Sequence, residues 1–472
     1  MSSVSALNSL LGSTSPTSGI NISQILQAAT GASSSGIDVT SAVNAAVTAA
    51  QAPETAWRNQ ESTLQSQASA LTQLQTDATN LDNDMVSLNS LTGPLSARTV
   101  NSSDSTLVTA SAAAGAALGN HTIVVNGLAT TASWASGTVA SATTDLAAGS
   151  FTITDATGNT TTISTGTGTS TLTDVASTIN NDNLGVTASV ITDANGARLA
   201  IVSNTSGAAN NFSVGNGSLT FSQAVMGVNA SLTVDGIALS SASNTVTGAL
   251  PGVTLNLLNA SPGTNVDLAI APDTSTASTA INQFVTDYNA AIKDLNTQYT
   301  DTGSGEGPLA ADSDVRSLQA TLQDALDYTY TPASGTTTMP NLSSMGISVQ
   351  NDGTLTVDSG TLSSALQNNF SDIQNFFQGA SLNGFANTVD QSLTSFISPA
   401  DGAFTVDLQS LNTEYSGLQT DISNFETNYI TPLRTQLQSE YSQAEILLQQ
   451  LPTEMQQINT ELGLNNNNSN GG

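Results

Sequence analysis

The 472-residue sequence contains no cysteine, only six lysines and arginines together, and a single histidine. Without cysteine, neither disulfides nor thiol chemistry can contribute to this protein. The 36 acidic residues give a formal net charge of −30. A chain with this balance has no basic surface that could neutralise phosphates or anionic lipids. The composition therefore argues against nucleic-acid binding and excludes a polybasic membrane contact.

Long apolar runs are also missing. No stretch approaches the roughly 18 consecutive apolar residues of a membrane-spanning helix. Met1 to Ser15 lacks the basic start and the continuous apolar segment of a secretory signal peptide. Only 9% of the residues are charged, so solubility must depend on Ser, Thr, Asn and Gln, as is typical of secreted surface proteins. The chain therefore looks like an extracellular protein that does not insert into a membrane, but it carries no ordinary export signal. Either it stays inside the cell, or it leaves by a route that does not cleave a signal peptide.

Catalytic motifs are lacking as well. His121 has no second histidine with which to form a metal site or a hydrolase triad, so we expect an ordinary surface residue. Asn351-Asp352-Gly353 resembles part of a calcium loop, but Ser348 and Ser359 would occupy its first and last ligand positions. This segment is therefore predicted to be a tight hairpin. The sequence predicts no enzyme, no metal site and no cofactor.

Heptad-spaced apolar residues dominate the stretch from Trp57 to Leu91. One row contains Trp57, Leu64, Leu71, Ala78 and Met85, and the other contains Gln60, Gln67, Leu74, Leu81 and Leu88. This spacing predicts a helix about 50 Å long with one narrow apolar stripe. The polar Gln60 and Gln67 within a core row suggest that this stretch contacts a neighbouring subunit.

The far end of the chain carries a matching pattern. Apolar residues alternate by three and four at Leu408, Leu411, Tyr415, Leu418, Ile422, Phe425 and Tyr429, and after Pro432 at Tyr441, Ala444, Leu448, Leu451, Met455, Ile458 and Leu462. A single stripe cannot be buried alone, so the two chain ends are expected to pair. The fold class predicted is α+β, with a long, coiled-coil-like helical leg built from both ends. The residues expected to form this leg and its contacts with other subunits are Trp57, Gln60, Leu64, Gln67, Leu71, Leu74, Leu81, Met85, Leu88, Leu411, Tyr415, Leu418, Ile422 and Phe425.

The middle of the chain changes to a period of two from Ala97 onward, which is typical of strands. Helical spacing returns at Ala277. This order predicts two nested β-rich head domains inserted between the helical ends. The expected division is a disordered leader at 1–36, the leg at 37–96 and 276–462, a first head domain at 97–148 and 215–275, an inserted β/α head domain at 149–214, and a disordered tail at 463–472.

The leader contains a few aliphatic residues in an uncharged, Ser- and Gly-rich setting: Ile20, Ile22, Ile25 and Leu26. Such a segment cannot bury enough surface to become ordered alone, but it is suited to folding on a partner. We expect it to become ordered on a partner.

Several short segments of the C-terminal half resemble the flagellar filament cap family, also called hook-associated protein 2. They are Pro251 to Leu257, Phe284-Val285 with Tyr288-Asn289, Gly307-Pro308-Leu309 with Asp312-Ser313, Gly346-Ile347, Asp352 to Leu355 with Val357-Asp358, Leu362, Ala365-Leu366 and Phe376-Phe377. Gly36-Ile37-Asp38 and Pro53 are similar to the family's opening. The 149–214 segment is similar to an insert shared by caps, flagellins and hook proteins, through Ile179-Asn180, Val186-Thr187-Ala188 and Arg198-Leu199.

The resemblance implies a structural protein at the distal tip of the bacterial flagellar filament. It would be secreted without a cleaved signal peptide and would form a ring that retains exported flagellin and promotes its folding and insertion. The leg residues and the leader residues named above would then contact the filament. The implied partners are flagellin, further copies of the chain with a pentamer favoured, the flagellar export apparatus and a cytoplasmic export chaperone. Two alternatives stay open: a secreted adhesin that binds host glycans through its heads, and a hook–filament junction protein or flagellin, which should lack the series from Gly346 to Phe377.

Overall fold

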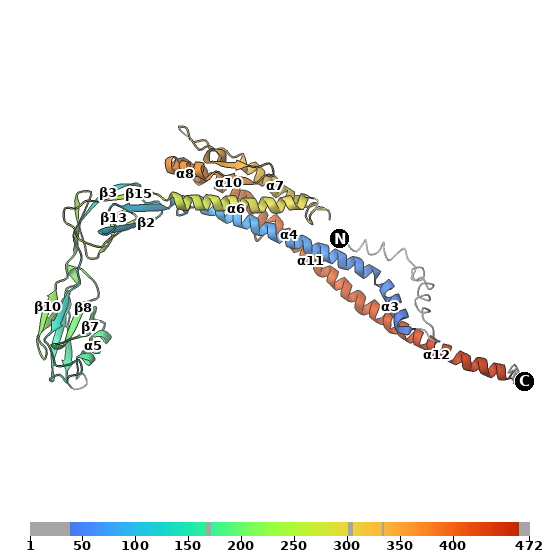
Figure 1. The fold of residues 1–472 in the computed structure, drawn as a ribbon, viewed down its shortest axis with the longest axis horizontal. Coiled ribbons are helices and arrows are strands. Elements are labelled where there is room, and N and C mark those ends of the chain that lie inside the picture. Colours follow the sequence, from blue (N-terminus) through green and yellow to red (C-terminus); the bar gives the residue numbers. More distant parts are fainter. Residues whose placement is uncertain (1–37, 167–170, 301–304, 333–334, 462–472) are drawn as a thin grey trace, which may run out of the picture. The chain divides into compact units, whose positions relative to one another are not determined.

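The computed structural model describes residues 38–166, 171–300, 305–332 and 335–461 (Figure 1). The expected leader and tail lie outside these residues. The chain divides into two compact units. One, here called the leg unit, contains the chain up to Asn80, Ala290–Leu322 and the chain from Ser392 onward. The other, the head unit, contains Leu81–Asn289 and Gln323–Gln391.

The leg unit begins with helix α3 (Val39–Ala50), whose first turn is capped by the Asp38 carboxylate, which accepts a hydrogen bond from the Ser41 amide at 3.1 Å. Helix α4 (Ala52–Asn89) follows directly and is 38 residues long. Pro53 lies in its first turn, where the missing amide hydrogen costs nothing. The predicted long helix is therefore confirmed, and it continues beyond Asn80 into the head unit.

Helix α11 (Ala403–Phe425) packs antiparallel against the part of α4 in the leg unit (Figure 1). The Trp57 and Phe425 rings meet edge to face with centroids 5.3 Å apart. At the other end of the pair, Gln75 Nε2 donates to Thr405 Oγ1 at 3.2 Å. The expected pairing of the two chain ends is therefore confirmed over this length.

Helix α11 continues through a π-helical turn (Glu426–Ile430) into helix α12 (Thr431–Glu461). A π turn adds one residue to the helical repeat, so the buried row moves from Ile422 to Ile430. Ile430 then forms a small core with Val43 and Val47 of α3. The change of phase that the sequence shows before Pro432 is thus a π turn in a continuous helix. Pro432 itself lies harmlessly in the first turn of α12.

The first β domain of the head unit contains two antiparallel sheets, with strand orders β1-β15-β3-β11-β12 and β13-β14-β2. The strands are β1 (Arg98–Ser102), β2 (Val108–Ala112), β3 (Gly119–Gly127), β11 (Ala230–Val234), β12 (Ile237–Ser241), β13 (Thr245–Leu250), β14 (Val253–Leu257) and β15 (Val266–Pro272). Their inward residues, among them Ile123, Leu232 and Leu255, form one core.

The inserted domain contains two further sheets, β10-β4-β8-β7 and β6-β5-β9, and helix α5 (Leu172–Asn181). Its strands are β4 (Ser133–Ser136), β5 (Gly149–Thr154), β6 (Thr160–Thr165), β7 (Val186–Asp193), β8 (Gly196–Ser203), β9 (Ser213–Gly215) and β10 (Phe221–Val225). Strand β4 pairs with β8 and β10 pairs with β4, although both lie outside the predicted 149–214 segment. The inserted domain is therefore larger than the sequence indicated.

The helical part of the head unit surrounds a cluster of aromatic rings. Its elements are most of α6 (Thr274–Tyr299), the hairpin β16 (Ile347–Val349) and β17 (Leu355–Val357), α8 (Ser359–Asn368), α9 (Phe370–Gln378) and the start of α10 (Phe385–Ile397). Helices α8 and α9 are separate, because Asn369 between them leaves the helical conformation. Residues 81–96, 276–289 and 323–391, assigned to the leg from the sequence, belong to the head unit.

Candidate functional site

The described residues hold no group of three or more acidic, His or Cys side chains that could bind a metal ion. His121 Nδ1 lies 2.7 Å from Asp235 Oδ2 in a surface pair between β3 and the β11–β12 turn. None of the described helices is long and apolar enough to cross a membrane. The predicted hairpin at Asn351-Asp352-Gly353 is confirmed, since it joins β16 to β17.

Most of the predicted contact residues on α4 are internal. Leu71, Leu74, Leu81, Met85 and Leu88 are almost completely buried, and Leu64 is nearly so. Side chains in this state stabilise the fold and have no surface left for a neighbouring subunit. Trp57 keeps partial exposure beside Phe425.

Gln60 and Gln67, the polar residues of the α4 stripe, find partners within the chain. Gln60 Nε2 donates to Glu414 Oε1 at 3.2 Å, and Gln67 Nε2 donates to the Pro308 carbonyl at 3.2 Å. These bonds explain the two glutamines without a second subunit. A subunit contact at this stretch remains a proposal.

The predicted residues on α11 form the partly open side of the helix pair. Ile422 is buried, whereas Leu411, Tyr415, Leu418 and Phe425 are half-buried. An open groove of about 490 Å³ lies between the helices and is lined by residues such as Leu64, Ala68, Leu411 and Tyr415. These side chains leave apolar surface that an additional helix could cover.

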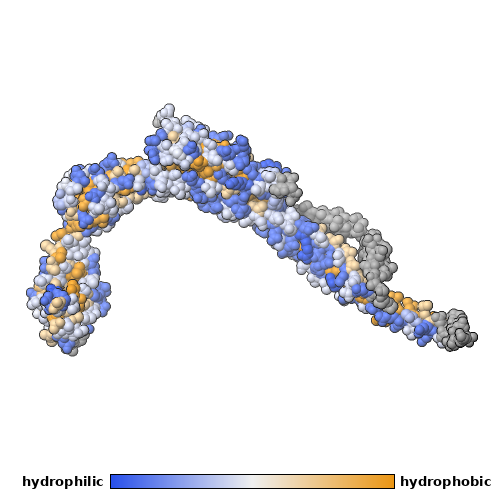
Figure 2. All heavy atoms as spheres, viewed as in Figure 1, coloured by the Kyte–Doolittle hydropathy of each residue, from blue (hydrophilic) through white to orange (hydrophobic). Residues whose placement is uncertain are grey.

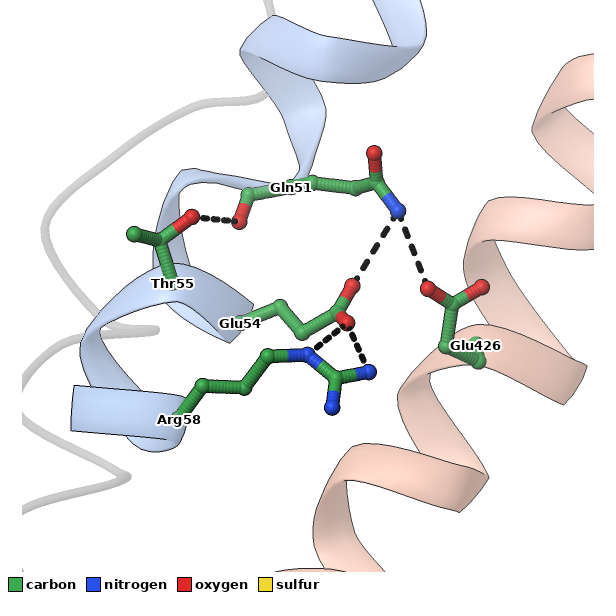
Figure 3. Close-up of polar contacts among 5 residues, drawn as sticks. All are labelled: Gln51, Glu54, Thr55, Arg58 and Glu426. Carbon is green, nitrogen blue, oxygen red and sulfur yellow. Dashed lines mark hydrogen bonds and ion pairs between the residues drawn. The ribbon is translucent and has the colours of Figure 1, made fainter. Parts of the chain in front are cut away.

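A polar cluster joins the α3–α4 junction to the π turn (Figure 3). Gln51 Nε2 donates to Glu54 Oε2 at 3.2 Å and to Glu426 Oε1 at 2.9 Å, and Arg58 Nε donates to Glu54 Oε1 at 2.7 Å. Glu54 is only 5% exposed. Burial by itself would raise the pKa of Glu54, but its contacts with Glu426, Arg58 and Gln51 hold that pKa below its usual value. Gln51, which donates to both Glu54 and Glu426, therefore links the start of α4 to the π turn.

Only part of this cluster can be recognised in the sequence. Glu54 and Arg58 have the i, i+4 spacing of a helical ion pair, which is readable from the chain. Glu426 comes from the opposite end of the sequence, and no nearby sequence pattern indicates that it joins this cluster.

The exposed end of α12 carries a continuous row of apolar side chains, here called the terminal stripe. Its members are Ile446, Leu447, Leu448, Leu451, Met455 and Ile458, which are between 44% and 62% exposed. Figure 2 shows hydrophobic surface over this end of the helix. The sequence predicted four of them as buried, but within the described residues nothing covers them. Ile446 and Leu447 were not singled out.

Acidic residues accompany the terminal stripe. From Glu440 to the end of α12 the charged residues are Glu440, Glu445, Glu454 and Glu461. Contiguous exposed apolar surface of this kind marks an interaction site on a soluble protein. The terminal stripe has helical spacing and acidic residues beside it. It is therefore suited to bind the apolar face of a partner helix that carries neutral or basic residues beside that face.

Both ends of the chain match one protein family. The profile of the flagellar hook-associated protein 2 N-terminus matches residues 35–132, and that of its C-terminus matches residues 227–453. These matches favour the cap interpretation over a junction protein or a flagellin, and the adhesin alternative gains no support from them.

Individual relatives agree with the profiles. The B-type flagellar hook-associated protein 2 of Pseudomonas aeruginosa is 29% identical over 318 residues, which cover 60% of this chain and 66% of the relative. The flagellar hook-associated protein 2 of Escherichia coli K12 is 29% identical over 255 residues, 48% of this chain and 53% of that one. The match thus leaves a third to a half of these relatives' lengths unaligned.

A solved structure shares the fold. The crystal structure of the D1-D2-D3 domains of the flagellar cap protein FliD from Escherichia coli superimposes with a TM-score of 0.59 at 28% identity. The match covers 73% of this chain and 99% of that one. With profiles matching at both ends and a common fold between them, the chain belongs to the flagellar hook-associated protein 2 family.

Proposed function

We propose that this protein caps the distal end of the bacterial flagellar filament. Copies of the chain would form a ring that retains exported flagellin and promotes its folding and insertion. The observation that carries the proposal is the family match at both chain ends, together with the fold shared with a flagellar cap protein. The protein would work by binding, without catalysis.

The proposed location is extracellular, at the filament tip, after export without a cleaved signal peptide. The chain would meet the flagellar export apparatus and a cytoplasmic chaperone on its way out. A closed ring requires heterologous contacts whose rotation closes, and a pentamer is the proposed number. The half-buried residues of α11, including Leu411 and Tyr415, would supply one part of such contacts.

The terminal stripe of α12 would bind the helical end of flagellin. An amphipathic helix laid against Leu447, Leu451 and Met455 would bury these exposed side chains. The leader residues Ile20, Ile22, Ile25 and Leu26 lie outside the described residues, and their contact with the filament is part of the same proposal.

Deletion of the gene tests the capping function directly. Cells that lack the protein should release monomeric flagellin into the medium and carry short filaments or none. Expression of the wild-type chain from a plasmid should restore filament length in electron micrographs and remove flagellin from the medium. Filaments of normal length with no flagellin in the medium of the deletion strain would disprove the proposal.

Substitution of Leu447→Ser, Leu451→Ser and Met455→Ser tests the terminal stripe. The melting temperature of the free protein should stay unchanged, because these side chains are exposed. Attachment to filament tips should be lost, since burial of each such side chain contributes about 1.5–3 kcal/mol. Co-sedimentation with purified filaments measures this binding.

The matched control for the stripe is Gln443→Ser, Gln449→Ser and Gln456→Ser on polar positions of the same helix. It carries the same loss of helix propensity without a loss of apolar surface. This control should bind filaments like the wild type. Equal binding by both triple variants and the wild type would show that the stripe has another partner.

A further inference from the structure

Two aspartates at the C-terminal end of α4 each face a carboxyl group on another helix of the head unit. The carboxyl group of Asp82 interacts with that of Asp390 on α10, and the carboxyl group of Asp84 interacts with that of Asp287 on α6. Asp82 Oδ1 and Asp84 Oδ2 are buried and have no hydrogen-bond donor. Two ionised carboxylates cannot donate to each other, so a proton on one member of each pair is what would satisfy these oxygens.

No cation compensates these pairs among the described residues, whose ion pairs are Arg58–Glu54, His121–Asp235 and Arg198–Asp193. Helix α10 has no charged residue other than Asp390, and α8 has none. On α9, Asp372 accepts hydrogen bonds from the Thr338 amide and hydroxyl at 2.8 and 2.7 Å. The only cation on α6, Lys293, is exposed and belongs to the leg unit together with Asp294. Within each pair, two ionised carboxylates would therefore repel each other with no nearby positive charge to compensate.

We propose that the packing of α4 against α6 and α10 is a proton-operated joint. With one shared proton in each pair, the carboxyl groups hold the three helices together through a hydrogen bond. When both members of a pair ionise, the bond becomes a repulsion between like charges, and the end of α4 loosens from its neighbours. The inference concerns the fold of this unit and holds whether or not the protein caps a filament.

The titration of the two aspartates places the change in an accessible pH range. Burial and then the Asp390 carboxyl raise the pKa of Asp82 to about 6. Burial and then the Asp287 carboxyl raise the pKa of Asp84 to about 7. Because these values lie above the ordinary Asp value of 3.8, the folded state binds more protons than the unfolded one. Their stabilising contribution is therefore complete below about pH 4 and is lost as the pH rises to about 7.

The full-length variant Asp82→Asn/Asp84→Asn tests the joint. Asparagine keeps the shape of the side chain, carries no charge, and can donate its amide hydrogens to Asp390 and Asp287 at every pH. We expect the wild-type melting temperature, followed by circular dichroism at 222 nm, to fall by about 4–8 °C between pH 5 and pH 8. The variant should lose less than half of that amount and should melt above the wild type at pH 8.

A control must separate the joint from general charge effects, because Asp407 in the leg unit also has a pKa raised to about 6, by burial and by Asp312 and Asp314. Asp324→Asn/Asp421→Asn removes two charges from exposed positions and should reproduce the wild-type dependence of melting temperature on pH.

Asp287→Asn/Asp390→Asn, which changes the opposite members of both pairs, should flatten this pH dependence as the first variant does. Hydrogen exchange, corrected for intrinsic rates, should slow in residues 81–89 and 385–391 at pH 8 in both joint variants. Wild-type pH slopes in both joint variants would overturn the proposal.

Discussion

Removal of residues 403–461 is expected to unfold the first half of α4 and all of α3 in addition to the deleted helices. In the leg unit, Leu64, Leu71 and Leu74 of α4 bury their side chains, and α11 lies along this length of α4, from Trp57 beside Phe425 to Gln75 beside Thr405. An amphipathic helix without a partner is marginal in water even when it is long, because its stability comes mainly from packing. Circular dichroism at 222 nm should therefore show a loss well beyond the deleted residues, including the 12 residues of α3.

A shorter deletion provides the control for this experiment. Removal of 444–461 eliminates the terminal stripe, on which no described residue packs, and should cost only the helix that is deleted. A loss confined to the deleted residues in the 403–461 truncation would show that α4 is stable without α11. Proteolysis of the truncated protein should then leave the segment around Trp57 intact, whereas we expect rapid cleavage there.

Periodicity in the sequence was sufficient to predict α4, α11 and their pairing, but not that the apolar row at the end of α12 is exposed. Leu64, Leu71 and Leu74 lie on one regular helix, so their spacing in the sequence shows the helical repeat directly. The π turn could not be predicted in this way. The apolar spacing changes near Pro432, and a proline usually indicates the end of a helix. The spacing of five from Phe425 to Ile430 was the local sign of an inserted residue.

The division into domains was less accessible to sequence reasoning. Strands β4 (SWAS) and β10 (FSQAV) mix apolar and small polar residues, as do the strands of the first β domain, so no change in composition marks the true start of the insert. Their assignment follows only from pairing with β8 and with each other. Likewise, Asp82 and Asp84 look like ordinary exposed acids until α6 and α10 bring Asp287 and Asp390 beside them.

The aromatic cluster of the head unit should be its most sensitive point. Phe385, at the start of α10, is 1% exposed. Its ring centroid lies 5.2 Å from that of Phe376 in a stacked arrangement, and 5.8 Å from those of Phe284, Phe377 and Tyr328. Phe385→Ala removes these contacts and leaves a cavity that the surrounding rings cannot fill. We expect the free energy of unfolding of this unit to fall by about 3–5 kcal/mol in urea titrations.

A second aromatic residue serves as the control for this prediction. Tyr429 stacks on Phe425 at 5.2 Å but is 48% exposed, so Tyr429→Ala should cost less than about 1 kcal/mol. Both residues stack on a phenylalanine, but only Phe385 is buried. The comparison therefore separates the contribution of ring contact to stability from that of burial. Phe385→Leu keeps most of the apolar volume and should lose less than half as much stability as Phe385→Ala. Equal costs for Phe385→Ala and Tyr429→Ala would mean that the cluster relaxes around the cavity and is not the tightly packed core described above.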